Sequence, residues 1–119
     1  MANTRNKMRN QTKHKLSFKI WLEHCEKPLI GKGGAQILEQ VEKEHSITKA
    51  AKKLGMSYRY VWSYIRRVER TVDKPIVKTY RGGRKGGGGA ELTSFGKALL
   101  EEYRRMENLL NKALSEFRQ

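Results

Sequence analysis

The sequence has 119 residues, one cysteine and a formal net charge of +14. This length predicts one domain with a core that needs no disulfide or metal, and the single cysteine excludes an intrachain disulfide and favours a reducing cytoplasm. The sequence has no apolar run of membrane-spanning length, and its polar, basic N-terminus lacks the apolar segment of a signal peptide.

The basic charge is concentrated in two parts of the chain. Residues 1–22 contain six basic and no acidic residues, and residues 46–89 contain twelve basic and two acidic residues. Residues 90–119 contain five of each. This asymmetry indicates a polyanion on one side of the molecule and a protein contact on the other.

The first part of the chain predicts an arm and a strand. Residues 1–15 have almost no apolar content, so we expect a disordered basic arm, which is either a solvated tail or a source of phosphate contacts. Residues 16–25 alternate apolar and polar side chains, which predicts a half-buried strand, and residues 27–31 predict a turn. Cys25 is expected to be a small buried apolar group.

A helix is predicted from Gly33 or Gly34 to Glu44. Ile37, Leu38 and Val41 lie on one helical face, opposite charged residues. The preceding glycines lack the pattern of a phosphate-binding loop, and we interpret them as the helix entry.

Residues 46–70 predict a short helix, a tight turn and a longer helix. Ser46 and Ser57 have hydroxyl oxygens suited to capping the two helices. Gly55 lies where the first helix must end, and glycine adopts a left-handed conformation at little cost. This is the pattern of a DNA-binding helix-turn-helix.

The second of these helices carries polar and aromatic residues at positions that the core does not need. They are Tyr58, Arg59, Tyr60, Trp62, Ser63, Arg66 and Arg67. The helix has four arginines and one acid, Glu69, whereas a solvated face normally mixes signs. We therefore interpret the element as a nucleic-acid-binding helix; the alternative is a purely structural helical hairpin.

A β-hairpin with a basic loop is predicted after this helix. Residues 76–80 are β-prone, residues 81–90 hold six glycines around Arg84 and Lys85, and residues 91–93 form a short return strand. Glycines let a backbone approach phosphates closely, and the two basic residues supply charge. The pattern predicts the wing of a winged helix; the alternative is a disordered linker.

The last helix is predicted to start with Thr93 or Ser94 as its cap and to end near residue 117. Its apolar residues step by three and four, which is close to a heptad seam: Phe95, Leu99, Tyr103, Met106, Leu110, Ala113 and Phe117. Part of this stripe must pack on the domain, and the remainder predicts a homodimer interface. The alternative is an intramolecular helix that lies across its own domain.

These features resemble a known family. Residues 57–62, SYRYVW, resemble the start of the recognition helix in molybdate-responsive ModE regulators, and residues 82–96, GGRKGGGGAELTSFG, resemble their glycine-rich wing. The resemblance covers residues 16–117 and extends more distantly to LysR-type regulators. It implies a homodimeric DNA-binding regulator whose last helix contributes to the dimer. ModE regulators continue into oxyanion-binding domains that residues 1–119 do not resemble, so no molybdate binding is expected here.

The sequence thus predicts a mainly α fold with a small β wing, a winged helix-turn-helix with a long C-terminal dimerisation helix. The expected divisions are an arm (1–15), the winged helix-turn-helix (16–92) and the dimerisation helix (93–119). The expected partners are double-stranded DNA and a second copy, with no membrane, in the cytoplasm on the nucleoid. The residues expected at the DNA are Lys49, Lys53, Ser57, Tyr58, Arg59, Tyr60, Trp62, Ser63, Arg66, Arg67, Arg81, Arg84 and Lys85.

The predicted function is a sequence-specific transcriptional regulator. The alternative is an architectural chromatin-type protein that binds DNA by charge with little sequence preference. An enzyme is not expected, because the sequence shows no nucleophile and base set and no paired carboxylates near a glycine loop. Neither a metal nor a cofactor is expected, because His14, His24, Cys25 and His45 lack the spacing of metal ligands.

Overall fold

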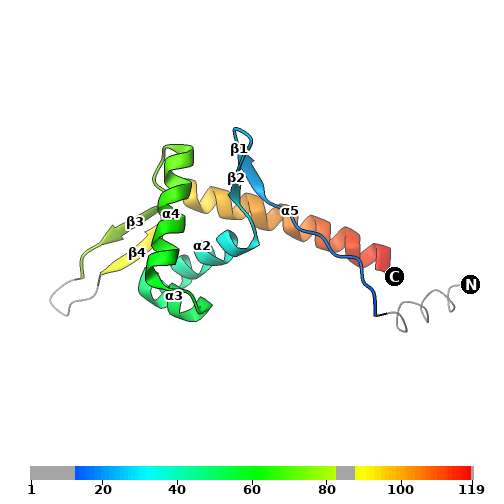
Figure 1. Cartoon of the computed structure of the whole chain (residues 1–119), viewed down its shortest axis with the longest axis horizontal. Helices are drawn as coiled ribbons and strands as arrows, with labels where there is room; N and C mark the ends of the chain where they lie inside the picture. Colours follow the sequence, from blue (N-terminus) through cyan, green and yellow to red (C-terminus); the bar gives the residue numbers. More distant parts are fainter. Residues whose placement is uncertain (1–12, 83–87, 119) are drawn as a thin grey trace, which may run out of the picture.

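The computed structural model describes residues 13–82 and 88–118. Four helices and two small hairpins follow one another along the described chain (Figure 1). The elements are β1 (Leu22–His24), β2 (Lys27–Ile30), α2 (Lys32–Glu44), α3 (Ile47–Leu54), α4 (Tyr58–Val72), β3 (Val77–Tyr80), β4 (Gly89–Leu92) and α5 (Ser94–Arg118). The predicted fold class, mainly α with a small β wing, is confirmed.

The local signals of the helix-turn-helix have the predicted geometry. The backbone N–H of Lys49 donates to the Ser46 hydroxyl over 3.1 Å, and that of Tyr60 donates to the Ser57 hydroxyl over 3.0 Å. Gly55 ends α3 with a left-handed φ of 67°. Each hydroxyl satisfies an N–H that the first helical turn leaves unpaired, so α3 and α4 begin where the serines place them.

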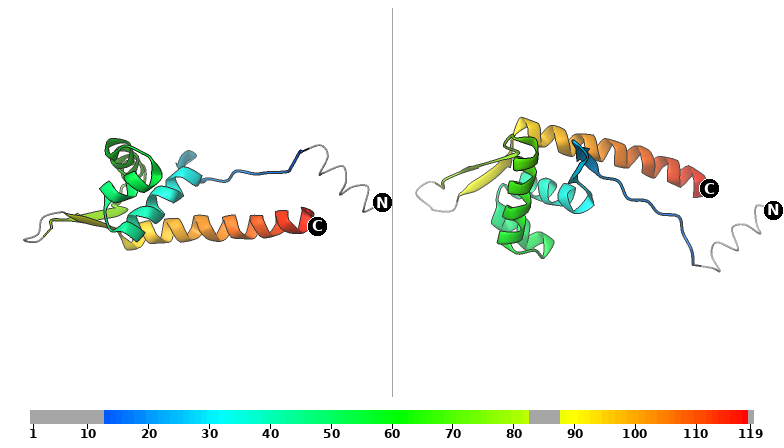
Figure 2. Two further views of the ribbon diagram at one scale, coloured as in Figure 1. Left: turned by 90° about the horizontal axis from the view of Figure 1, so that it is seen from below. Right: turned by 45° about the horizontal axis from the view of Figure 1, so that its top comes forward.

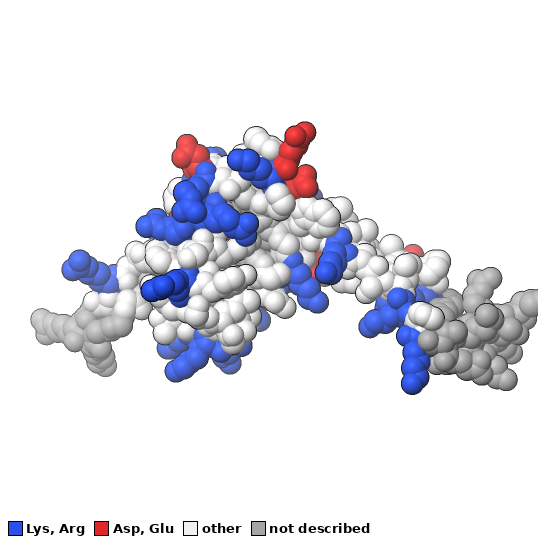
Figure 3. Space-filling model, viewed as in Figure 1, with Lys and Arg blue, Asp and Glu red and all other residues white. Residues whose placement is uncertain are grey.

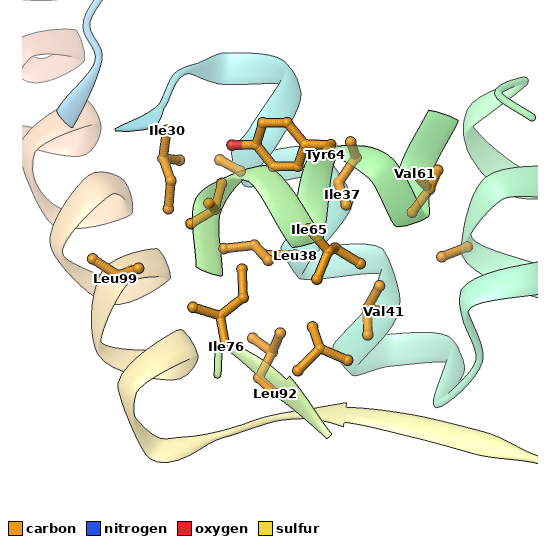
Figure 4. Close-up of a cluster of buried hydrophobic side chains, with 14 of the residues drawn as sticks. Ile30, Ile37, Leu38, Val41, Val61, Tyr64, Ile65, Ile76, Leu92 and Leu99 are labelled. Atoms are coloured by element: carbon orange, nitrogen blue, oxygen red, sulfur yellow. The ribbon is translucent and has the colours of Figure 1, made fainter. Parts of the chain in front are cut away.

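One apolar core joins α2, α3 and α4 to both hairpins and to the first half of α5 (Figure 4). Its largest fully buried side chains are Tyr103, Ile30, Ile37, Leu38, Ile65, Ile76, Val41, Val61 and Val68. The buried apolar residues as a whole lie on or directly beside β2, α2, α3, α4, β3, β4 and α5, so the core holds the helix-turn-helix, the wing and α5 in one unit.

A hydrogen bond from Tyr64 ties α4 to the first hairpin. The Tyr64 hydroxyl, which is buried, donates to the carbonyl oxygen of Leu29 over 3.0 Å. The tyrosine passes directly over Gly34 of α2, where an added Cβ would lie 1.8 Å from the hydroxyl oxygen. Gly34 therefore serves close packing between α2 and α4, which refines its interpretation as a residue of the helix entry.

The predicted wing is present as two paired strands. Strands β3 and β4 are antiparallel, with Val77 opposite Leu92 and Tyr80 opposite Gly89. The return strand begins at Gly89, earlier than the predicted residue 91. The predicted basic loop of the wing, with Arg84 and Lys85, lies outside the described residues.

The N-terminal strand prediction was wrong in its position. Residues 13–21 have no regular secondary structure, β1 is confined to Leu22–His24, and the predicted turn at 27–31 is strand β2. The turn instead lies at Cys25 and Glu26, whose φ angles are 50° and 67°. Cys25 is exposed at this turn, so its predicted burial was wrong as well.

Helix α5 starts as predicted and leaves the domain halfway along its length (Figure 2). The Thr93 hydroxyl accepts a hydrogen bond from the backbone N–H of Gly96 over 3.0 Å, in the manner of a helix cap. Leu99 and Tyr103 are buried in the core, and from residue 104 onward no residue of the helix is buried. Within residues 13–82 and 88–118, no helix is long and apolar enough to cross a membrane.

Candidate nucleic-acid interface

Helix α4 is divided into a buried face and an exposed basic face. Val61, Tyr64, Ile65, Val68 and Val72 are buried in the core. Seven other side chains of the helix are exposed to solvent: Tyr58, Arg59, Tyr60, Ser63, Arg66, Arg67 and Arg70. The helical period thus separates packing residues from residues that are free to meet a ligand.

Further basic residues on α3 and at the wing extend this face. Lys49, Lys52 and Lys53 are exposed on α3, and Arg81 is exposed directly after β3. Figure 3 shows Lys and Arg side chains over α3, α4 and the base of the wing, while most of the visible acidic side chains lie at the upper margin. Groups of one sign on adjacent elements create a positive potential suited to a polyanion.

The single acid of α4 is engaged with backbone groups and does not offset this charge at the helix start. One Glu69 carboxylate oxygen accepts hydrogen bonds from the backbone N–H groups of Ile76 and Val77, over 2.9 and 3.3 Å. The other oxygen lies 3.9 Å from an Arg66 nitrogen. Glu69 therefore joins the end of α4 to the start of the wing, and sequence reasoning had counted it only as a charge.

Two arginines of α4 lie over aromatic rings. The guanidinium of Arg66 is 5.0 Å from the Trp62 ring centre, and that of Arg67 is 5.3 Å from the Tyr64 ring centre. Such stacking restricts the arginine side chains and orients their donors. Trp62 is half-buried and packs against the core, so the prediction that it occupies a position unused by the core was wrong.

A hollow lies between α3, α4 and the wing, and it was not predicted from the sequence. It has a volume of about 210 Å³ and is lined by residues that include Thr48, Tyr58, Thr79 and Tyr80. The Tyr80 side chain is 50% exposed and the Tyr58 side chain 51%. A polar aromatic residue just before the glycine-rich segment was the available signal for Tyr80. Both tyrosines line this hollow, where α3, α4 and the wing adjoin.

Most of the predicted DNA-binding residues are exposed on α3, at the start of α4, along α4 or directly after β3: Lys49, Lys53, Ser57, Tyr58, Arg59, Tyr60, Ser63, Arg66, Arg67 and Arg81. Arg84 and Lys85 lie outside the described residues. In the predicted dimer seam, Leu99 and Tyr103 are buried in their own protomer and Phe95 packs against the core, whereas Met106, Leu110, Ala113 and Phe117 are exposed. Across the described ranges, no three His, Cys, Asp or Glu residues are grouped so as to hold a metal ion.

The geometry defines a winged helix-turn-helix domain, and comparison with known proteins gives its family. The model of the family described as bacterial regulatory helix-turn-helix protein, lysR family, matches residues 34–97, more than half of the chain. The chain belongs to this family.

Curated relatives support the more specific resemblance to ModE. The chain is 37% identical over 79 residues to the molybdenum transport protein ModE of Azotobacter vinelandii, covering 66% of this chain and 29% of the relative. It is 34% identical over 77 residues to the DNA-binding transcriptional dual regulator ModE of Escherichia coli K12, covering 65% and 29%. The chain thus spans less than a third of the length of these relatives.

Solved structures share the fold. The DNA-binding domain of CbnR, in a complex with DNA, aligns with a TM-score of 0.54 and 25% identity over 71% of this chain and 90% of that chain. ArgP from Mycobacterium tuberculosis aligns with a TM-score of 0.53 and 24% identity, over 71% of this chain and 30% of that chain.

Proposed function

We propose that the chain is a sequence-specific double-stranded DNA-binding transcriptional regulator that acts as a homodimer. The observation that carries the proposal is the exposed face of α4, where arginines and tyrosines stand beside the lysines of α3 and the base of the wing. The DNA complex of the CbnR domain, which has the same fold, supports it.

In this proposal α4 enters the major groove. Arg59 and Ser63 face base edges, where arginine pairs with guanine O6 and N7. Tyr58 and Tyr60 pack on thymine methyls or on the sugar-phosphate backbone. Half-buried Trp62 contributes by holding Arg66 in place rather than by reaching the bases.

Phosphate contacts come from residues around α4. The DNA backbone beside the recognition helix is held by Lys49, Lys53, Arg66 and Arg67. Ser57, which caps this helix, lies at the edge of the contact. Arg81, Arg84 and Lys85 reach the phosphates from the wing. These contacts fix the register of the protein on the duplex and supply most of the salt-dependent affinity.

The second copy pairs through the outer half of α5. Met106, Leu110, Ala113 and Phe117 are exposed along one stripe, and packing them against the same stripe removes apolar surface from water. A two-fold dimer presents two recognition helices, so we expect an operator with two inverted half-sites about one helical turn, or a multiple of it, apart.

The function proposed for this chain includes no cofactor, catalytic role or molybdate site. We place the protein in the cytoplasm, on the nucleoid, where its DNA would be. The second candidate function is an architectural chromatin-type protein, which the net charge of +14 favours.

A binding selection separates the two candidates. The purified protein is incubated with fragmented genomic DNA at about 150 mM salt, and the retained fragments are sequenced. A shared inverted repeat is the expected result. Retained fragments without any shared motif would overturn the regulator and favour the architectural protein, in which the α4 side chains bind without reading bases.

A further inference from the structure

Basic and aromatic side chains interleave along residues 13–21, here called the N-terminal strap. Lys15, Phe18, Lys19 and Trp21 follow one another in the sequence, all four are exposed, and the strap contains no acid. The Phe18 side chain is 37% exposed and the Trp21 side chain 54%. The strap therefore offers positive charge and flat apolar surface side by side.

The strap forms one wall of an open hollow, and α5 forms the other. Figure 2 shows the strap alongside the outer half of α5, and the space between them measures about 600 Å³. Phe18 and Trp21 line it from the strap, and Tyr103 and Leu114 line it from α5. The helical wall runs from residue 103 to residue 118, which is about 22 Å at 1.5 Å per residue. This length matches about six phosphates of a stacked single strand, which are spaced about 3.4 Å apart.

The lining of the hollow is net basic. It contains four basic residues and one acid: Lys15, Lys19, Lys32, Arg118 and Glu107. The Glu107 carboxylate accepts a hydrogen bond from the Arg104 guanidinium over 2.8 Å, so its charge is compensated within α5. The three lysines form no ion pair with any other residue that the structure describes. The hollow therefore attracts an anion.

Three contacts hold the walls of the hollow in place. The Arg118 guanidinium donates to the carbonyl oxygen of Leu16, and Ile20 packs against the core. The indole N–H of Trp21 donates to the Glu23 carboxylate over 2.8 Å, which orients the ring. Walls that are ordered before a ligand arrives lose less conformational entropy on binding.

The hollow lies apart from both interfaces of the proposed regulator. Its lining residues on α5 are Tyr103, Glu107, Asn111, Leu114 and Arg118. At about 100° per residue, this stripe is centred about a quarter turn from the proposed dimer stripe through Met106, Leu110, Ala113 and Phe117. Among the described residues, none from α3, α4 or the wing lines the hollow, which is at the end of the molecule away from the wing (Figure 1).

We propose that this hollow binds a single strand of nucleic acid. The phosphates lie against Lys15, Lys19 and Lys32, and bases stack on the rings of Phe18 and Trp21. A duplex is a poorer ligand, because its bases are stacked on one another and present only their edges in the grooves. An acidic peptide matches the charge, but it does not repeat a flat ring with each negative charge, as a nucleic acid strand does. The site goes beyond the proposed function and does not depend on it.

The fluorescence of Trp21 tests the stacking contact in the full chain. The sequence holds two tryptophans, so Trp62→Phe leaves Trp21 as the sole reporter. Oligothymidylate and oligouridylate of about twelve nucleotides are the probes, and a short random-sequence duplex is present throughout to occupy the basic face of α4. We expect quenching of Trp21 by at least one probe, and the tighter probe identifies DNA or RNA as the source of the strand. Unchanged emission with both probes would overturn the proposal.

Matched lysine variants test the phosphate contacts. Lys15→Gln with Lys19→Gln removes two charges from the lining, and Lys27→Gln with Lys112→Gln removes two charges from exposed positions outside it. Anisotropy of the labelled, tighter strand is measured with the same duplex present, and circular dichroism melting confirms that each variant is folded. The first pair is expected to lower the slope of log affinity against log salt by about 1.4, since each phosphate contact of a single strand contributes about 0.7. The second pair should leave the slope unchanged. Equal changes for the two pairs would mean that the strand responds to net charge alone, and the site would be refuted.

Phe18→Ala separates stacking from charge. It is expected to weaken binding of the strand about tenfold without a change in the salt slope. Leu109→Ala is the control, because it removes an exposed apolar side chain of α5 that does not line the hollow. Polyglutamate of matching charge carries no bases, so it should displace the strand only weakly. Displacement as effective as that by the unlabelled strand would identify an acidic chain as the ligand and contradict the proposal.

Discussion

Arg59 and Lys53 are both exposed and basic, but they lie on different elements and are assigned different roles in the proposed complex. Arg59→Ala removes a base contact, so its cost should be about 1–3 kcal/mol on the operator and much smaller on random DNA. Lys53→Ala removes a phosphate contact, so it should weaken operator and random DNA alike and lower the salt slope by about one. Fluorescence anisotropy titrations at several salt concentrations measure both. Equal losses for the two variants on both DNAs would refute the assignment.

Ionisation of Tyr64 should lower the free energy of unfolding at alkaline pH. Burial raises the pKa of the Tyr64 hydroxyl from 10.0 to about 12, and the hydroxyl must stay protonated to donate to the Leu29 carbonyl. Because the folded-state pKa lies above the unfolded-state value, the stabilisation is complete below pH 10 and is lost as the pH rises from 10 to 12. The difference between the two pKa values corresponds to roughly 3 kcal/mol.

Tyr64→Phe isolates this effect. The variant leaves the buried Leu29 carbonyl without its donor, so it should lose about 1–3 kcal/mol of unfolding free energy at neutral pH. Since phenylalanine does not ionise, the stability gap between the wild type and the variant should shrink from pH 9 to pH 12. Urea unfolding at a series of pH values measures the gap; a gap that stays constant or widens would disprove the linkage.

Single residues were predictable where their role is local. Ser46, Gly55 and Ser57 act on groups within a few positions of themselves, so their sequence context is sufficient. The contact between Tyr64 and Leu29 spans 35 positions, and no short pattern encodes it. Trp62 was misplaced for the same reason, because its half-burial depends on how other elements pack around α4.

At the scale of elements, the start of α2 contains two adjacent glycines with opposite surroundings. A Cβ at Gly34 would lie 1.8 Å from the Tyr64 hydroxyl oxygen, whereas a Cβ at Gly33 would meet no atom within 4 Å. Gly34→Ala should therefore destabilise the fold by about 1–3 kcal/mol or more through overpacking. Gly33→Ala should be neutral or stabilising by about 0.5–1 kcal/mol, because alanine favours helix. Thermal melts of the two variants measure this difference in stability. A similar melting temperature for both variants would count against the packing of α2 on α4.

Elements were predictable to different degrees. The helices α2 to α5 were predicted because their periodicity and caps agree, and the wing was predicted from β-prone residues around a glycine-rich segment. The turn of the first hairpin was predicted at the wrong residues, because the residues that form it, Cys25 and Glu26, adopt positive φ although neither is glycine. The stripe of α5 was predicted to pack partly on its own domain, but the point of division was not predicted: core packing ends at Tyr103, and only the tertiary structure determines that point.

At the scale of the whole molecule, dimerisation and DNA binding should be coupled. Leu110→Glu with Phe117→Glu places charges in the proposed seam, outside the core, so the monomer should fold normally. Affinity for an operator with two half-sites should fall at least a hundredfold, while affinity for a single half-site should be nearly unchanged. Gel-shift titrations on both DNAs, with light scattering for the molar mass, test this. A dimer that persists in the variant would locate the interface elsewhere.

The attachment of α5 to the wing has a mechanical consequence. The backbone N–H of Thr93 donates to the Ile76 carbonyl oxygen over 2.9 Å, and the Thr93 hydroxyl donates to the Pro75 carbonyl oxygen over 2.8 Å. The helix has 25 residues and so is about 37 Å long. One end of this long helix is therefore fixed to the segment that follows the recognition helix α4. In the proposed dimer, a slight change in the angle at which the two α5 helices cross would move the two α4 helices apart or together. The spacing of the half-sites in the operator would therefore report that crossing angle.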